Sequence, residues 1–270
     1  MTFDLIKKGG ALCFSFFYVT QACYAYDSVT LEFGTSVQRV SYTEGSSSSQ
    51  PLNKESGLLP GLVLGAKVAN QKTSVFAKAY LSKATIDYKG QTQSSRDLQT
   101  TTNTFRSEYI VGVAYQLDYW ARVSLAASRY DWDRKINGTD NSLPLDEYYQ
   151  WKIAKLGLKI RLFKGNADQL NLGITYGKLF GESLKVDLSD LGYGQPSIPL
   201  SGRAYEQFGL NHIHQWTAKT QLKFDITYTN LEFDQSPSIN ANNGFRSISI
   251  REPASKTELI ELALTISQKF

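Results

Sequence analysis

Two histidines are the first residues in this sequence that could bind a metal ion or carry a proton. His212 and His214 stand two positions apart. On a β-strand this spacing points both imidazoles to the same face, where they could hold a metal ion weakly. No third ligand is evident in the sequence, and both residues fall beside a predicted short turn. We therefore expect interfacial turn residues here and no metal site.

Acidic residues in predicted loops and strand ends are the second candidate for chemistry. They are Asp131, Asp133, Asp140, Asp146, Glu147, Asp187, Asp190 and Asp234. A hydrolase that uses Asp131, Asp133 or Asp234 is one hypothesis, since paired carboxylates serve acid/base chemistry or bind calcium. Solvated loop charges explain the same residues more simply. Because Gly-x-Ser-x-Gly, phosphate-loop and His-Glu-x-x-His motifs are absent, we predict no catalytic residue, no cofactor and no metal.

The elements that carry these residues show an alternation of period two, which is typical of β-strands with two different faces. In the last segment Ile260, Leu262, Leu264 and Ile266 share one face, while charged and small residues take the other. Residues 216–228 repeat the arrangement, with a charged face that needs water or charged partners. A barrel whose outer face meets lipid and whose lumen is polar satisfies both faces.

The same pattern predicts about ten strands, with eight or twelve as the alternatives. The ranges are 28–42, 56–70, 73–88, 104–117, 119–135, 147–164, 168–184, 202–214, 217–234 and 256–270. Short connections are expected at 70–72, 118, 164–168 and 213–215, and long polar loops at 43–55, 89–103, 136–146, 185–201 and 235–255. Residues 245–250 could add a hairpin. Such alternation of turns and loops is typical of an up-and-down transmembrane barrel.

Aromatic residues near the strand ends predict two interfacial girdles. One is formed by Tyr115, Tyr119, Trp120, Phe163 and Trp216, and the other by Tyr109, Tyr130, Trp132, Tyr148 and Trp151. Ordinary core packing is the alternative interpretation.

By parity, basic side chains outnumber acidic ones in the predicted lumen. The basic cluster comprises Lys67, Lys78, Arg106, Arg122, Lys155, Lys159, Arg161, Lys219 and Lys223. A paired network that fills the interior is the simpler interpretation. A narrow passage that favours anions is the functional one, since rings of Lys and Arg attract anions.

Residues 1–25 resemble a cleaved export signal, with Lys7 and Lys8 before an apolar stretch and a small residue, Ala25, before the predicted cut. Cys13 and Cys23 both lie inside this signal, so the predicted mature domain, residues 26–270, contains no cysteine. This fits a periplasmic route, where a spare thiol endangers folding. The net charge of +4 is too small and scattered to indicate nucleic acid.

Together these features resemble the bacterial outer-membrane β-barrel proteins, and the strand count is similar to that of the omptin surface proteases. The terminal Phe270, with Leu262, Leu264 and Ile266, resembles the C-terminal signal read by the barrel-assembly machinery. The resemblance implies an outer-membrane location in contact with lipid and lipopolysaccharide. An omptin-type site would need an Asp-His pair at the extracellular rim, where this sequence has no histidine.

We therefore expect a non-enzymatic outer-membrane barrel with a structural or surface-interaction role through its long loops. A narrow porin for small anions and a rim-active hydrolase are the alternative functions.

Overall fold

The computed structural model describes residues 27–45, 52–91, 97–140 and 142–270, and it is built almost entirely of β-strands. Ten long strands form the main sheet: β1 (Ser28–Glu44), β2 (Asn53–Ala69), β3 (Thr73–Gln91), β4 (Asp97–Asp118), β5 (Ala121–Ile136), β6 (Leu145–Lys164), β7 (Asp168–Asp187), β9 (Ser201–Gln215), β10 (Thr220–Asp234) and β13 (Ser255–Lys269). No helix in these ranges is long and apolar enough to cross a membrane.

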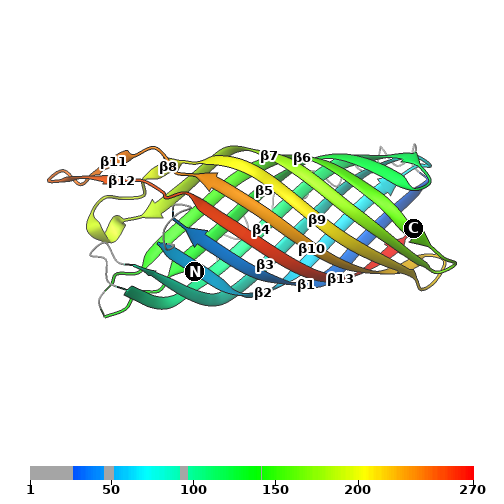
Figure 1. Ribbon diagram of the computed structural model, residues 1–270, viewed down its shortest axis with the longest axis horizontal. Helices are drawn as coiled ribbons and strands as arrows, with labels where there is room; N and C mark the ends of the chain where they lie inside the picture. The colour runs from blue at the N-terminus through cyan, green and yellow to red at the C-terminus, as the bar shows by residue number, and fades with distance from the viewer. Residues whose placement is uncertain (1–26, 46–51, 92–96, 141) are drawn as a thin grey trace.

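The ten strands close into one antiparallel barrel (Figure 1). Each strand pairs with the next long strand along the chain, and β1 pairs with β13 from Thr30 opposite Lys269 to Glu44 opposite Ser255. The pairing of β6 with β7 joins the two halves of the sheet. Closure removes the unpaired edges that an open sheet would leave. The predicted fold class, an up-and-down barrel of ten strands, is confirmed.

Alternation along the strands separates the lumen from the outer surface. In β13, Glu261, Ala263 and Thr265 are buried inside the barrel. The intervening Leu262, Leu264 and Ile266 are 41%, 54% and 49% exposed on the outside. An apolar outer band over a polar interior is the arrangement that a lipid bilayer requires.

Short turns join the strands at one end of the barrel, which we call the turn end. They are residues 70–72, 119–120, 165–167 and 216–219. In the first, the Asn70 side chain accepts hydrogen bonds from the backbone N–H groups of Lys72 and Thr73. The predicted turn at 213–215 was misplaced, because β9 continues to Gln215.

The opposite end, which we call the loop end, carries the longer connections and three small strands (Figure 1). β8 (Ser197–Pro199) pairs with β7, and β11 (Ile239–Asn242) forms a hairpin with β12 (Ser247–Ile250). A short 3-10 turn, η2 (Ser189–Leu191), precedes β8. The loop predicted at 89–103 was too long, because β3 and β4 continue their pairing to Gln91 and Asp97.

The aromatic residues near the turn end lie as predicted on the outer surface: Tyr115, Tyr119, Trp120, Phe163 and Trp216 are 44%, 75%, 45%, 56% and 63% exposed. The second predicted girdle was wrong in three members. Tyr130, Trp132 and Trp151 are 7%, 1% and 0% exposed. Their side chains point into the barrel, as do the other residues of the same parity in β5 and β6. The predicted signal at residues 1–25 lies outside the described residues, as do residues 46–51 of the loop predicted at 43–55.

Candidate functional site: the interior of the barrel

Aromatic side chains fill the lumen toward the loop end. The Trp151 ring stacks on Tyr130 with centroids 4.5 Å apart and contacts the Phe233 ring edge-on at 5.3 Å. Trp132 meets Tyr42 edge-on at 5.2 Å. These rings come from strands β1, β5, β6 and β10, on different sides of the barrel. They belong to one core cluster, which we call the aromatic plug, together with Leu179, Leu184, Val186, Ile198 and other buried residues.

Arg134 is the centre of a buried ionic network beside the aromatic plug. Its guanidinium donates hydrogen bonds to Glu55 at 2.9 Å and to Glu147 at 2.8 Å, and it lies 3.5 Å from Glu44. It also lies over the Tyr42 ring, 4.3 Å from the centroid. The Arg134 side chain is 0% exposed. A buried guanidinium with several carboxylate partners is compensated for the loss of hydration.

Glu252, in the loop that precedes β13, extends this network at the loop end. The hydroxyls of Tyr149 and Tyr42 donate hydrogen bonds to the Glu252 carboxyl at 2.6 Å and 3.2 Å. The backbone N–H of Glu252 donates to the Ser236 hydroxyl at 2.7 Å. Burial, followed by the nearby carboxylates of Glu44 and Glu147, raises the pKa of Glu252 well above its usual value. Three carboxylates thus contact the Arg134 guanidinium directly, and Glu252 adds a fourth carboxyl group through the tyrosine hydroxyls.

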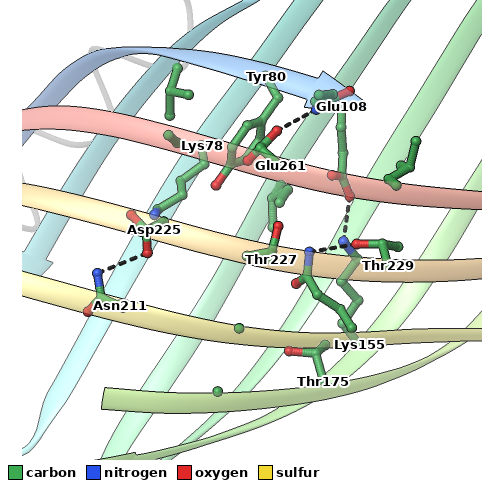
Figure 2. Close-up of a pocket in the computed structure, with 18 of the residues that line it drawn as sticks. Lys78, Tyr80, Glu108, Lys155, Thr175, Asn211, Asp225, Thr227, Thr229 and Glu261 are labelled. Carbon is green, nitrogen blue, oxygen red and sulfur yellow. Dashed lines mark hydrogen bonds and ion pairs between the residues drawn. The ribbon is translucent and has the colours of Figure 1, made fainter. Parts of the chain in front are cut away.

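Below the aromatic plug, toward the turn end, the lumen holds two adjoining cavities. The upper cavity has a volume of about 240 Å3 and is lined by paired polar groups (Figure 2). Lys155 forms an ion pair with Glu108, and Asn211 donates a hydrogen bond to Asp225 at 2.9 Å. The lower cavity has a volume of about 330 Å3 and reaches Ser74 and Arg122, next to the short turns.

Most of the predicted basic cluster lines these cavities. Lys67, Lys78, Arg122, Lys155, Lys159 and Lys223 all line the lower one. Arg161 lies opposite Asn171, another lining residue, in the pairing of β6 with β7. Arg106 is instead buried between Tyr130 and Trp132, with its guanidinium carbon 5.1 Å and 4.9 Å from the ring centroids.

Lys219 is a correction to the predicted cluster. It lies in the exposed turn at 216–219, before β10 begins at Thr220. Its backbone N–H donates to the Thr217 side chain at 3.3 Å as part of that turn. Parity places residues only within a strand, so it cannot place Lys219.

The two histidines lie on the outer surface near the turn end, as predicted. Both imidazoles are within hydrogen-bond distance of the same carboxylate oxygen of Asp168, each at 3.0 Å. Asp168 is the acidic neighbour that the sequence did not reveal, since it lies 44 positions from His212. Even so, the described residues contain no group of three or more His, Cys, Asp or Glu side chains arranged to hold a metal ion.

Two of the acidic residues considered for hydrolysis are held by arginines. Asp131 accepts hydrogen bonds from Arg129 at 3.0 Å and from the Tyr148 hydroxyl at 2.7 Å. Asp234 forms an ion pair with Arg203 at 2.5 Å. Asp133 lies on the same face of β5 as Asp131, and neither residue is among those that line the two lumen cavities. Both histidines lie at the other end of the barrel.

Sequence reasoning missed the Arg134 network. The sequence did give its strand and face, because Arg134 has the same parity in β5 as Arg122, Tyr130 and Trp132. A buried arginine requires carboxylates on the same inner face, and Glu44, Glu55 and Glu147 satisfy the parity of their own strands. Glu252 had no such signal because it lies in a loop.

This interior belongs to a closed antiparallel barrel of the type found in outer-membrane proteins. No family model and no curated protein matches the sequence. Among solved structures, the chain is similar to the outer membrane protease OmpT of Escherichia coli, with 10% identity, a TM-score of 0.57, and coverage of 90% of this chain and 97% of that one.

Two autotransporter domains are also similar in outline. For the translocator domain of NalP from Neisseria meningitidis the identity is 11%, the TM-score 0.48 and the coverage 98% of both chains. For the β domain of BrkA from Bordetella the values are 12% and 0.45, with 90% of this chain and 100% of that one covered. At these identities the likeness to OmpT supports the fold of the chain alone.

Proposed function

We propose that the protein is a non-enzymatic, non-conducting outer-membrane barrel that makes surface contacts through its loop end. In this proposal the loop end faces the cell exterior and the turn end faces the periplasm, as long and short connections do in bacterial barrels. The observation that carries the proposal is the exposure of the Phe245 side chain at the loop end. Its side chain is 95% exposed at the tip of the β11–β12 hairpin, beyond the barrel.

The hairpin holds Phe245 in a defined position. The Asn243 side chain accepts hydrogen bonds from the backbone N–H groups of Phe245 and Arg246, at 3.1 Å and 2.9 Å. Gly244 adopts a φ of 86°, a left-handed conformation that glycine accepts at low cost. At the base, Ile239 and Ile250 pack against the aromatic plug. A rigidly held aromatic beside an arginine is the kind of anchor that dominates binding interfaces.

The filled lumen supports the non-conducting part of the proposal. Trp132, Trp151 and Arg134 are among the largest fully buried side chains, and they occupy the interior at the loop end. The two cavities lie on the turn-end side of this packing, and Tyr130 and Tyr205 of the aromatic plug line the upper one. A barrel of about ten strands has room for side chains inside but little more, whereas open aqueous pores use about 16 to 18 strands.

A narrow anion porin is the second candidate, favoured by the basic lining of the lower cavity. Planar-bilayer recordings of the folded barrel separate the two functions. We expect no unitary conductance from the proposed surface protein. Reproducible anion-selective steps would replace it with the porin.

Basic residues on the outer face of β5, β6 and β7 favour lipopolysaccharide as a lipid partner. Arg129 in β5 lies directly opposite Lys152 in β6, and Lys178 in β7 lies opposite Ala154, two residues further along β6. All three side chains are exposed on the outer face. Arg129 is paired there with Asp131, and lipid phosphates would neutralise Lys152 and Lys178. We propose lipid and lipopolysaccharide at this face and the barrel-assembly machinery at β13 as partners.

Binding by barrels in nanodiscs tests the surface role. The wild type, Phe245→Ser and Tyr119→Ser would be compared on lipopolysaccharide-bearing vesicles, extracellular-matrix proteins and immobilised nanodiscs of the same barrel. Tyr119 is a matched control, since it is an aromatic residue 75% exposed in a turn at the other end. We expect the wild type and Tyr119→Ser to bind at least one of these surfaces, and Phe245→Ser to lose that binding. Equal behaviour of the three proteins on every surface would refute the proposal.

A further inference from the structure

The lower cavity contains more positive charge than its own carboxylates can pair. Six basic residues line it, against Glu32 and Asp225 as the acidic ones. Glu32 is already paired with Lys223 and, at 3.5 Å, with Lys78. Figure 2 shows Asp225 between Asn211 and Lys78. Both acidic residues are therefore engaged by groups other than Lys67, Arg122 and Lys159.

The unpaired basic residues face one another across neighbouring strands. Arg122 in β5 lies directly opposite Lys159 in β6, and both line the lower cavity. Arg161 is two residues beyond Lys159, on the same face. Like charges placed opposite each other in a sheet repel. A negative charge between them would convert this repulsion into attraction.

Hydrogen-bond donors at the same place also lack acceptors. The Nε atoms of Arg122 and Arg161 are buried and have no hydrogen-bond partner in the described part of the chain. Arg122 donates one hydrogen bond through Nη2, to the Ser74 hydroxyl at 3.2 Å. Among the described residues, neither Lys67 nor Lys159 is in ion-pair contact with a carboxylate. Buried donors are nearly always satisfied, so these two arginines indicate a missing acceptor.

We infer that the lower cavity is a binding site for a small phosphate-bearing anion. Guanidinium groups match the oxygens of a phosphate in a two-pronged arrangement, and lysines add point charges. The charge of a phosphate matches an excess of several basic side chains better than a single-charged ion does. The volume of about 330 Å3 suits a small molecule and excludes a polymer.

The lower cavity borders the turn end of the lumen. The cavity is lined by Ser74, Arg122, Gln169 and Gln221, each the second residue of its strand after a short turn. At the other side the aromatic plug and Arg134 separate it from the loop end. The anion therefore enters and leaves through the turn end. This inference concerns retention of a ligand inside the barrel, and it is independent of the proposed surface role.

Isothermal titration of the full barrel, folded in detergent at low ionic strength, tests the site with two probes. Inorganic pyrophosphate represents a free phosphate, and glycerol 3-phosphate represents a lipid headgroup. We expect saturable binding of at least one probe with a stoichiometry of one. The tighter probe then identifies the source of the natural ligand. Heat that never saturates, or that sodium chloride of equal ionic strength abolishes completely, would overturn the inference.

Three variants locate the binding. Arg122→Gln and Lys159→Gln should each weaken binding tenfold or more. Lys89→Gln is the matched control, because it removes one positive charge from an exposed side chain of β3 near the loop end. Equal affinity in all three variants would place the anion elsewhere, including the outer basic face, and would refute the lower cavity as the site.

Thermal unfolding supplies a readout that a purely structural arginine would not give. In anion-free buffer Arg122→Gln should unfold at a higher temperature than the wild type, because it relieves the repulsion from Lys159. Pyrophosphate should raise the unfolding temperature of the wild type and leave that of Arg122→Gln almost unchanged. A lower unfolding temperature for Arg122→Gln without anion would show that the arginine supports the fold, and the inference would fail.

Discussion

The guanidinium of Arg134 donates a hydrogen bond of 2.9 Å to Glu55, a residue 79 positions away in the chain and on a strand that is not its neighbour in the sheet. Both side chains are 0% exposed. The contact spans the lumen, so it ties β2 to β5 independently of the backbone ladder. It makes the loop end of the barrel an ionic and aromatic core instead of an opening.

Arg134→Ala should destabilise the barrel strongly. The substitution leaves Glu44, Glu55 and Glu147 buried without their cation, and losing one partner of a buried pair costs about 3–5 kcal/mol. Arg129→Ala is the matched control, since Arg129 is also paired with an aspartate but is 52% exposed. That variant should lose about 1 kcal/mol or less. Urea unfolding in detergent, followed by tryptophan fluorescence, measures both.

A companion variant separates charge from packing. Adding Glu55→Gln to Arg134→Ala removes one of the stranded carboxylates, so the double variant should be more stable than the sum of the two single changes predicts. Strict additivity would mean that Arg134 contributes mainly through its contacts with the Tyr42 and Trp132 rings.

Glu252 should make the barrel more stable at acidic than at neutral pH. Its folded-state pKa is raised, by burial and by Glu44 and Glu147, above the unfolded value, which is about 4.3. The folded state therefore holds this proton more tightly. The free-energy cost of burying a charged Glu252 is absent below the unfolded pKa and grows as the pH rises toward the folded pKa. Urea midpoints between pH 4 and 8 should show this decline.

Glu252→Gln provides the check on this assignment. The amide oxygen can still accept from Tyr149 and Tyr42, but the group no longer titrates. The variant should be at least as stable as the wild type at neutral pH, with a flatter pH profile. Asp190→Asn, at an exposed loop position, should keep the wild-type profile. An unchanged slope in Glu252→Gln would assign the pH dependence to another group.

The sequence predicted the barrel more completely than its interior, and Trp132 explains why. Period-two alternation is a property of each strand alone, so the strand number, closure and apolar outer face followed directly. Trp132 was assigned to a girdle from its position near a strand end, although its parity with Arg122 places it inside. Parity gives the face of a residue and does not give its partners across the lumen. Those depend on how the strands are staggered around the barrel, which no single strand encodes.

Asp168 and Glu252 illustrate two further limits. The contact of Asp168 with His212 and His214 depends on the register between β7 and β9, which places Asp168 opposite His214. Glu252 lies between β12 and β13, where no periodicity orients a side chain. The prediction that Lys219 faces the lumen failed for the same reason, since Lys219 lies in a turn.

Gly34→Ala should impair closure of the barrel. A Cβ at Gly34 would lie 2.2 Å from the backbone oxygen of Leu264, in the ladder that joins β1 to β13. Backbone atoms cannot move aside without breaking this pairing. Gly173→Ala is the control, because the nearest atom to its Cβ would be a backbone oxygen at 3.8 Å. We expect Gly34→Ala to lose the gel-mobility shift on boiling that marks a folded barrel, and Gly173→Ala to keep it. Equal shifts would show that the β1–β13 ladder can adjust.

Trp151→Ala should weaken the barrel without opening it. The indole is 0% exposed and stacks on Tyr130, so its removal leaves a cavity and should cost about 3–5 kcal/mol. Trp132, Arg134 and Phe233 still occupy the surrounding lumen, and planar bilayers should therefore remain without conductance. Trp120→Ala, at an outer position 45% exposed, should cost clearly less. Steady current through Trp151→Ala alone would mean that the aromatic plug is a thin gate above the two cavities, and it would revive the anion porin as the function of the lumen.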